Sequence, residues 1–472
     1  MRWPRSWTGQ ESHPCRRNGR RQSTEFRNVT ARVSLTMIVK NEAATLAHCL
    51  SSVRDLVDEM IVVDTGSSDN TKDIAKQHGA CVFELPWPDS FAVARNESIC
   101  HAAGQWLLWL DADEHIDEPN RAKLRSLLAN LQDDNASYVM RQRSAAASGS
   151  AILADHVRLF RNHPAIRWDY RVHEQIPPSL CKAGHIVRAT DIVIEHSGYL
   201  DAGQARGKLE RNLRLLRLDV ADRPNDPFVL FNLGWTLTNL DHWSEAVPLL
   251  QRGLQHAHPV YFLTPKLYAL LARCHRSLDQ LAEAWAVSQA GHVRYPHDTE
   301  LLFLKELLQG QLCHQRGDNA AARRCWTQLL EDRSPTVAAP AADGIFRSID
   351  TGVCGPLARQ HLAWLDFDEG RFADAENHWR TILADMPTCT PARLGLAELY
   401  LQQKRWSELV DLLNELEPHA PQQAAGFRAR MNRASHDFTA PLPEAIAAEQ
   451  VECLPPDAGL MFTVIVAADV SE

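Results

Sequence analysis

The sequence predicts two architectures in one chain: an α/β domain with a mostly parallel sheet, followed by an all-α solenoid of repeated helical hairpins. From Val33 to about Tyr199, short apolar runs of strand length alternate with stretches whose apolar residues recur at helical spacing. Strands that alternate with helices form a mostly parallel sheet covered on both faces. Beyond Asp201 the strand signal ends, and landmark residues recur with a period of about 34 residues, which is typical of a helical repeat.

The composition is that of a soluble globular protein, with 472 residues, 45% apolar and 23% charged. A net charge of −9 gives no indication of nucleic-acid binding. No run approaches the ~18 consecutive apolar residues of a transmembrane segment. The eleven cysteines are scattered singly, without a CxxC pair. Because such cysteines are typical of reduced core thiols, we expect a cytoplasmic protein without a disulfide framework or a zinc site.

The first 32 residues carry eight arginines and no apolar segment that could serve as a secretory signal. This composition predicts a disordered basic tail or a start codon placed too early. A basic arm that contacts acidic lipid or a partner is the alternative.

Four apolar runs of the first domain are predicted strands: 33–39, 60–64, 81–85 and 105–110. The stretches between them are predicted helices: 42–57, 71–79 and 97–104. Trp106 and Trp109 would lie on opposite faces of the fourth strand, both in the core. Ligands of parallel sheets bind outside the carboxyl ends of the strands, and Asp64 and Asp111 both fall at strand ends of this kind.

The second domain repeats four landmarks: a Leu-Gly or Leu-Ala step, a small residue thirteen positions on, a bulky residue four later, and then Pro. Copies begin at Leu233, Leu271, Leu362 and Leu396, with a poorer one around Gly310. Small residues let two helices approach closely, and each hairpin leaves a face for its neighbour to bury. The pattern resembles the tetratricopeptide repeat over about 226–421, which implies a concave face for a peptide or another subunit. An irregular helical domain is the alternative.

An acidic motif follows the fourth strand, where Asp111 and Asp113 flank the small Ala112. Alternate residues of an extended segment point the same way, so the two carboxylates can share one cation. Mg²⁺ or Mn²⁺, with its preference for oxygen ligands and phosphate, suits such a site.

Several motifs together resemble the family 2 glycosyltransferases of the GT-A fold, a Rossmann-like α/β architecture, over roughly 33–200. They are MIVKNEAATL (37–46), DTGSSDNT (64–71), ARN (94–96), DAD (111–113) and HEQ (173–175). The resemblance implies a hexosyltransferase that inverts the anomeric carbon and uses a UDP-sugar with Mn²⁺ or Mg²⁺. The corresponding boundaries are 1–32 for the tail, 33–205 for the GT-A domain, 206–225 for a helical linker, 226–421 for the repeats and 422–472 for a segment without an assigned structure. Within the last, 461–469 reads as a strand.

The resemblance also implies roles for single residues of the first domain. The donor nucleotide would contact Val39, Asn41, Glu42, Asp64, Arg95, Asn96 and Asp111. The metal ligands would be Asp113, Asp111 and His196. Glu174 would be the catalytic base. Thr65 departs from the pattern, because many relatives have a second acidic residue there, and the ED pair and QxxRW segment of the family are absent.

Some side chains keep two interpretations. His173 and His196 could instead be buried core histidines. Arg158 and Arg161 are either ligands of a diphosphate or anionic acceptor, or salt-bridged surface residues. Trp87 is expected to pack a loop over the nucleotide pocket.

MIVKNE and DTGS with trailing repeats resemble a bacterial subgroup that includes peptide and protein glycosylators. This implies a peptide, protein or glycan acceptor, recruited partly by the repeats. Two other functions are considered. A nucleotidyltransferase shares the sheet and the carboxylates, but its glycine-rich phosphate loop is missing near the first strand. A non-catalytic repeat scaffold with a decayed transferase domain is the third.

Overall fold

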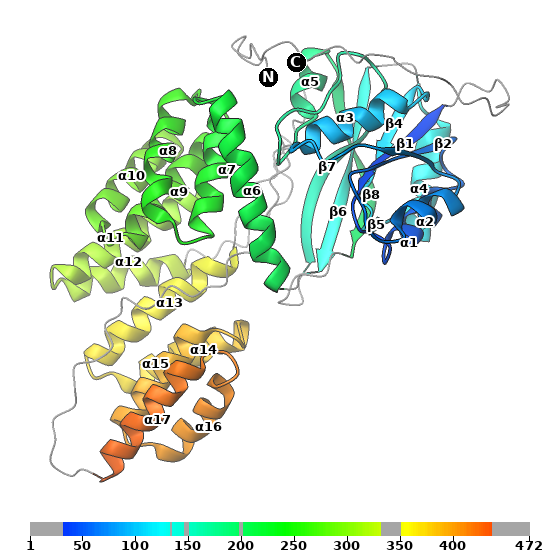
Figure 1. Ribbon diagram of the computed structural model, residues 1–472. Coiled ribbons are helices and arrows are strands. Elements are labelled where there is room, and N and C mark those ends of the chain that lie inside the picture. Colours follow the sequence, from blue (N-terminus) through cyan, green and yellow to red (C-terminus); the bar gives the residue numbers. More distant parts are fainter. Residues whose placement is uncertain (1–31, 133–134, 146–150, 198–201, 332–350, 437–472) are drawn as a thin grey trace. The chain divides into compact units, whose positions relative to one another are not determined.

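The computed structural model describes residues 32–132, 135–145, 151–197, 202–331 and 351–436. The chain divides into two compact units, one that runs to Pro224 and one that begins at Asn225 (Figure 1). Each unit is described by itself. The basic tail, apart from Arg32, and the predicted strand at 461–469 lie outside the described residues.

The first unit is built on an eight-stranded sheet in the order β3-β2-β1-β4-β7-β6-β8-β5. The strands are β1 (Val33–Val39), β2 (Glu59–Asp64), β3 (Cys81–Glu84), β4 (Trp106–Trp109), β5 (Glu114–His115), β6 (Ala136–Ala145), β7 (Ala151–Arg161) and β8 (Ile186–His196). The first four are mutually parallel, as predicted. Beyond them the sheet is mixed, because β7 is antiparallel to β4 and to β6, whereas β8 is parallel to β6.

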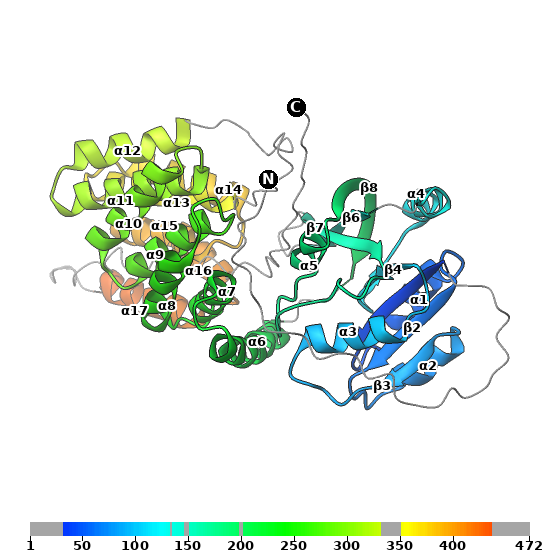
Figure 2. The ribbon, with the colours of Figure 1, turned by 90° about the horizontal axis from the view of Figure 1, so that it is seen from above.

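Helices cover both faces of this sheet. They are α1 (Leu46–Val53), α2 (Thr71–Gln77), α3 (Phe91–His101), α4 (Glu118–Ala129) and α5 (Pro177–Lys182), and the helix α6 (Ala202–Asp222) follows β8 in the chain. Residues of α1, α2 and α4 share one core cluster with Trp106, and residues of α3 and α5 share the other with Trp109. In Figure 2, α1 and α4 lie on one side of the strands and α3 and α5 on the other. The two tryptophans are 1% and 6% exposed, so both are core residues on opposite faces, as predicted.

Two helices of the first domain begin at residues other than those predicted. The helix predicted at 42–57 shortens to α1, because the chain leaves β1 through Asn41 in the left-handed region (φ 59°) and turns before Leu46. The helix predicted at 97 starts at Phe91, where Ser90 caps it by accepting a hydrogen bond from the Val93 amide (3.2 Å).

The helical linker predicted at 206–225 corresponds to most of α6, a helix that clusters with the first unit. Arg214 donates two hydrogen bonds to the Asp89 carboxylate, at 2.8 and 2.6 Å. Asp219 accepts from the Arg171 amide at 2.9 Å, and Arg223 contacts Asp169 at 2.5 Å. These bonds attach α6 to the loops that precede α3 and α5.

The second unit consists of helices that pack as successive hairpins. They are α7 (Pro227–Thr238), α8 (Trp243–His256), α9 (Thr264–Ser277), α10 (Leu281–Arg294), α11 (Thr299–Gln315), α12 (Asn319–Glu331), α13 (Thr351–Asp368), α14 (Phe372–Asp385), α15 (Thr390–Gln402), α16 (Trp406–Leu416) and α17 (Pro421–His436). α17 accounts for part of the segment left without an assignment.

The close approaches predicted for the small landmark residues are present in these hairpins. A Cβ added at Gly234 would lie 2.6 Å from a methyl carbon of Leu250, and one at Gly310 would lie 2.3 Å from the Trp326 indole nitrogen. The absence of a side chain therefore lets the bulky partner pack directly on the opposing helix. No helix among the described residues is long and apolar enough to cross a bilayer.

Candidate functional site

The polar residues predicted to bind a ligand gather at the carboxyl ends of β1, β2 and β4. Asp64 ends β2 and is 2% exposed. Its Oδ1 accepts from the backbone amides of Gly66 (2.9 Å) and Ser67 (2.8 Å), in a turn that Gly66 makes possible with a φ of 107°. Its buried Oδ2 has no hydrogen-bond partner within the described part of the chain. A buried oxygen of this kind is an acceptor that a ligand can satisfy.

The turn after β1 is joined to the turn after β2. The Val39 carbonyl accepts from the Thr65 amide at 2.9 Å and from its hydroxyl at 3.1 Å. The backbone N–H of Asn41 donates to the Ser67 hydroxyl at 2.9 Å, and the side-chain Oδ1 of Asn41 accepts from the Ser68 backbone N–H at 2.8 Å. Thr65 therefore connects the ends of β1 and β2.

Glu42 lies between this double turn and the acidic motif. Its backbone amide donates to the Thr71 hydroxyl at 2.8 Å, and its carboxylate accepts from the Thr45 hydroxyl at 3.2 Å. Burial raises the pKa of Glu42, and the negative charges of Asp113 and Asp111 raise it further. Three predicted donor-binding residues, Val39, Asn41 and Glu42, thus line the same edge as the acidic motif.

Asp111 is held at its side chain and at both backbone polar atoms. Arg95 Nη2 donates to Oδ1 at 2.8 Å, the Asp111 amide donates to Glu114 Oε2 at 2.8 Å, and Cys49 Sγ donates to the Asp111 carbonyl at 3.3 Å. Burial opposes ionisation of this carboxyl, but the charge of Arg95, followed by that of Arg158, outweighs it and lowers the pKa of Asp111.

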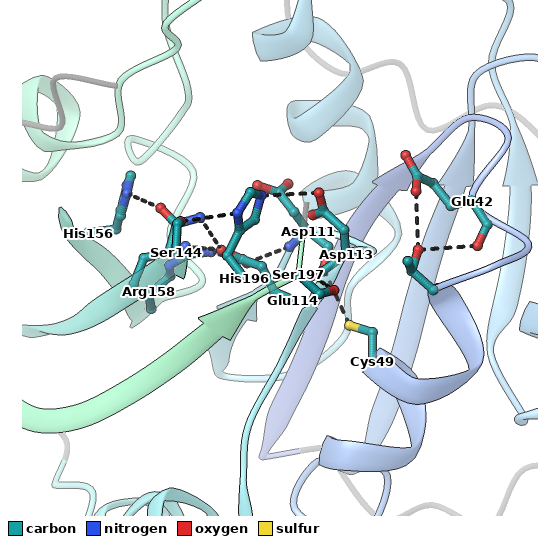
Figure 3. Close-up of polar contacts among 12 residues, drawn as sticks. Glu42, Cys49, Asp111, Asp113, Glu114, Ser144, His156, Arg158, His196 and Ser197 are labelled. Atoms are coloured by element: carbon teal, nitrogen blue, oxygen red, sulfur yellow. Dashed lines mark hydrogen bonds and ion pairs between the residues drawn. The ribbon is translucent and has the colours of Figure 1, made fainter. Parts of the chain in front are cut away.

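Asp113 and His196 face each other across two antiparallel strands. Glu114 of β5 pairs with His196 of β8, and this register leaves 3.1 Å between Asp113 Oδ2 and His196 Nε2 (Figure 3). Ser197 donates its amide (2.9 Å) and its hydroxyl (2.7 Å) to the Asp113 carbonyl, and Ser144 lies 3.1 Å from His196 Nδ1. The hydrogen bond to Asp113 raises the pKa of His196 against the effect of burial.

The Asp113–His196 separation fits two neighbouring ligands of one small divalent ion. Metal–ligand bonds of ~2.1 Å at right angles place adjacent ligand atoms about 3 Å apart. No set of three or more His, Cys, Asp or Glu side chains is assembled for a metal among the described residues. Asp111, the third predicted ligand, turns Oδ1 to Arg95 instead. Mg²⁺ and Mn²⁺ commonly complete their coordination with water and substrate phosphate, so two protein ligands suffice.

Arg95 connects the acidic motif to the predicted catalytic base. Its Nε donates to Glu174 Oε1 at 2.7 Å, while Nη2 reaches Asp111. The guanidinium stacks over the Trp109 ring at 4.4 Å and the Trp168 ring at 5.1 Å. Three predicted site residues therefore form one ion-pair chain, in which Arg95 contacts protein carboxylates rather than facing an open diphosphate site.

Asn96, a predicted donor-binding residue, is bonded through its side chain to the backbone of Trp168. Its side-chain amide donates to the Trp168 carbonyl (2.9 Å) and accepts from the Trp168 amide (2.9 Å). Both polar ends of the side chain are thus used to hold the loop that carries Glu174.

That loop is narrow and strained. Asp169 and Gln175 close it with two backbone hydrogen bonds of 3.0 Å. Tyr170 and His173 inside it have φ values of 69° and 55°, a region that costs energy for non-glycine residues and is found often at functional sites. Burial, together with the charge of Arg211, lowers the pKa of His173 to about 4, so its imidazole is neutral near pH 7.

Two residues next to the acidic motif were not foreseen in their observed roles. Glu114 had no predicted role, and Arg158 was expected at a ligand or on the surface. Both side chains are fully buried and pair with each other. A charged residue between the apolar Val157 and Leu159 signals such a pair, but the sequence does not identify its partner. Trp87 packs edge-on against Phe91, with 4.8 Å between ring centroids.

Comparisons with known proteins identify both parts of the chain. Residues 34–177 match the family model "Glycosyl transferase family 2", and residues 366–431 match "Tetratricopeptide repeat". The TPR repeat-containing protein Synpcc7942_0270 of Synechococcus elongatus is 38% identical over 259 residues, which are 53% of this chain and 64% of that protein. The glycosyltransferase SunS of Bacillus subtilis prophage SPbeta is 28% identical over 234 residues, 48% of this chain and 54% of SunS. Both matches therefore span less than two thirds of the relative. The crystal structure of S. aureus TarS, 15% identical, aligns with a TM-score of 0.36 over 58% of this chain and 55% of TarS.

Proposed function

We propose that this chain, which carries a family 2 glycosyltransferase domain followed by tetratricopeptide repeats, is an inverting, divalent-metal-dependent hexosyltransferase that uses a UDP-sugar. The observation that carries the proposal is the Asp113–His196 pair, 3.1 Å apart at the edge of the sheet where the motif residues gather. Relatives named as glycosyltransferases support the same activity.

The buried Oδ2 of Asp64 supports a uracil base in the donor. The N3–H of uracil is a hydrogen-bond donor, and a buried carboxylate oxygen that lacks a partner in the described structure is its natural acceptor. Val39, Asn41 and Glu42 would border the base, because their backbone is joined to the Asp64 turn. A base without a donor at this position would leave the Asp64 oxygen unsatisfied.

Asp113 and His196 would hold Mn²⁺ or Mg²⁺, with Asp111 beside them. When bound, the ion supplies Lewis-acid neutralisation of the charge that develops on the leaving diphosphate. Asp111, kept ionised by Arg95, would orient the ribose or the transferred sugar through its remaining oxygen. Asp111 and Asp113 would thus lie beside the donor diphosphate, where a cation is needed to balance the negative charge.

Glu174 would act as the general base. It would take the proton of the acceptor hydroxyl as that oxygen bonds to the anomeric carbon and the bond from this carbon to the phosphate oxygen breaks, which releases UDP with inversion. Arg95 fixes the Glu174 carboxylate by the 2.7 Å hydrogen bond, and the strained loop fixes its backbone. Arg95 is thus a positioning residue that holds the base at a set distance from Asp111.

The acceptor would be a peptide, protein or glycan, recruited partly by the repeats. Successive hairpins of a tetratricopeptide array form an extended concave surface, which is suited to a chain-like ligand. The proposal that the second unit binds the acceptor predicts that its removal raises the KM for the acceptor and leaves the KM for the donor unchanged.

The experiment that tests this function incubates the protein with Mn²⁺ and a panel of nucleotide sugars and measures the nucleoside diphosphate that is released. We expect UDP from at least one UDP-sugar, and no release when EDTA removes the metal. A nucleotidyltransferase would instead release pyrophosphate from a nucleoside triphosphate and a sugar phosphate. A scaffold without activity would neither bind nor hydrolyse any donor. When the proposed metal ligand is tested by Asp113→Ala, the matched control is Asp73→Asn, which alters an exposed carboxylate on α2.

A further inference from the structure

A fully buried ion pair lies directly against the acidic motif. Arg158 of β7 donates from Nη1 to Glu114 Oε2 at 2.8 Å and from Nη2 to Glu114 Oε1 at 2.6 Å, and both side chains have 0% exposure (Figure 3). Charges removed from water to this extent are costly, and they are tolerated only when paired in good geometry with further hydrogen bonds. Arg158 also stacks on the Trp109 ring at 3.8 Å.

The carboxylate of Glu114 accepts two hydrogen bonds at each oxygen. Oε1 receives a second one from Gln142 Nε2 at 2.9 Å, and Oε2 receives a second one from the Asp111 amide at 2.8 Å. Gln142 in turn lies 3.1 Å from His156 Nε2. With four donors directed at it, this carboxylate has one orientation, and so does the Asp111 backbone that is bonded to it.

Glu114 also sets the position of the neighbouring pair. It stands opposite His196 in the two-residue β5 strand, so the place of Glu114 fixes the register that brings Asp113 to His196. β5 is too short to fix that register by its own ladder. The buried contact with Arg158 therefore anchors the acidic motif to β7, a long strand in the middle of the sheet.

We propose that Glu114 and Arg158 are a positioning pair for the donor site, which set the geometry of Asp111, Asp113 and His196 and thereby the affinity for a nucleoside diphosphate with its metal. This role rests on the proposed function. Replacement of a buried ion pair by apolar residues of similar volume is often neutral or stabilising, so fold stability alone does not require these charges. The hydrogen bond from Asp111 to Glu114 is what an apolar pair cannot supply.

The test compares the wild-type full-length chain with the double variant Glu114→Leu/Arg158→Met. UDP binding in the presence of Mn²⁺ is measured by calorimetry, the KM for the donor by UDP release, and stability by thermal unfolding. We expect the double variant to fold with a lowered Tm, because the Asp111 amide and Gln142 Nε2 lose their acceptor, and to lose about 10–100-fold in UDP–Mn²⁺ affinity, the range typical when residues that orient metal ligands are removed. The KM should rise by a similar factor.

The control is Glu398→Leu/Arg430→Met, which removes a two-bond Glu–Arg pair (2.7 and 2.6 Å) between α15 and α17 of the second unit. Its UDP–Mn²⁺ affinity should equal that of the wild type. If Glu114→Leu/Arg158→Met does not fold, Arg158→Lys keeps the charge and loses the paired geometry. A raised KM with little change in Tm supports positioning, and an unchanged KM overturns it.

The outcomes separate the two proposals. Equal UDP–Mn²⁺ affinity in the wild type and the folded double variant overturns the positioning role and leaves the transferase function intact. No binding of UDP by the wild type at any Mn²⁺ concentration overturns both.

Discussion

Asp113 and His196 lie 3.1 Å apart, Oδ2 to Nε2, although one follows the fourth strand of the sheet and the other ends the eighth. The antiparallel pairing of β5 with β8 produces this contact. It places the carboxylate of a short acidic motif, which on its own is common in proteins, beside an imidazole at the spacing that two neighbouring ligands of a divalent ion would have.

If Asp113 and His196 hold the metal as proposed, His196→Ala should raise the Mn²⁺ concentration needed for half-maximal UDP release by at least about 10-fold, because one of the two proposed protein ligands is lost. His256→Ala, which alters an exposed histidine on α8, should leave the Mn²⁺ dependence unchanged. An identical Mn²⁺ titration for the two variants would exclude His196 as a ligand.

Glu174→Gln should keep donor binding and lower transfer by about 10²–10⁴-fold, the contribution typical of a general base. The amide retains the shape of the side chain and can still accept from Arg95. Calorimetry with UDP and Mn²⁺ reports binding, and single-turnover transfer reports chemistry. A normal transfer rate would assign the base to another residue.

Arg95→Met should destabilise the protein, because two carboxylates lose their shared cation. The removal of one partner from a fully buried pair costs about 3–5 kcal/mol, and we expect roughly 2–3 kcal/mol here because Asp111 is partly exposed. Urea unfolding of Arg95→Met and Arg95→Lys measures this cost. The lysine variant should retain part of the stability, since it keeps the charge and loses the two-pronged geometry. Equal stability of all three proteins would show that the ion-pair chain contributes nothing to the fold.

Acid should destabilise the fold through His173. Its folded-state pKa of about 4 lies below the ordinary value of 6.5, so the unfolded chain binds the proton more readily as pH falls from 6.5 to 4. The contribution of His173 to the free energy of unfolding is fully present above pH 6.5 and is lost as the pH falls towards 4. Asparagine tolerates the left-handed backbone at this position. His173→Asn should therefore reduce the difference in the free energy of unfolding between pH 7 and pH 5 by up to about 2 kcal/mol. Asp219, whose pKa burial raises to about 6, titrates in both proteins and cancels in the comparison. Parallel stability curves for wild type and variant would contradict the assignment.

Gly310→Ala should destabilise the second unit by about 1–3 kcal/mol, because the added methyl would overlap the Trp326 ring. Gly355→Ala on α13 is the control, since a Cβ there meets nothing within 4 Å and alanine favours the helix. Thermal unfolding distinguishes them. A higher Tm for both variants would mean that the glycine at 310 is not needed for packing.

The parallel half of the sheet was predictable because each strand is a continuous buried apolar run, and the strands 33–39 and 60–64 agree with β1 and β2 within one residue. The mixed half was not. An alternating apolar pattern can indicate a strand but not which neighbours it takes in a mixed sheet, and the partner of a buried charge such as Arg158 depends on that strand order. Likewise, Arg95 and Asn96 were recognised as motif residues, yet their observed contacts with Glu174 and Trp168 come from a loop some 70 residues further along.

The most direct measurement compares hydrolysis of a UDP-sugar by wild type and Asp113→Ala at saturating Mn²⁺, with UDP release as the readout. Our account predicts metal-dependent release by the wild type and a decrease of about 10²-fold or more in the variant, since several kcal/mol of charge stabilisation depend on this ligand. Undiminished release by Asp113→Ala would contradict the metal site, and its absence from the wild type with every donor would contradict the proposed activity.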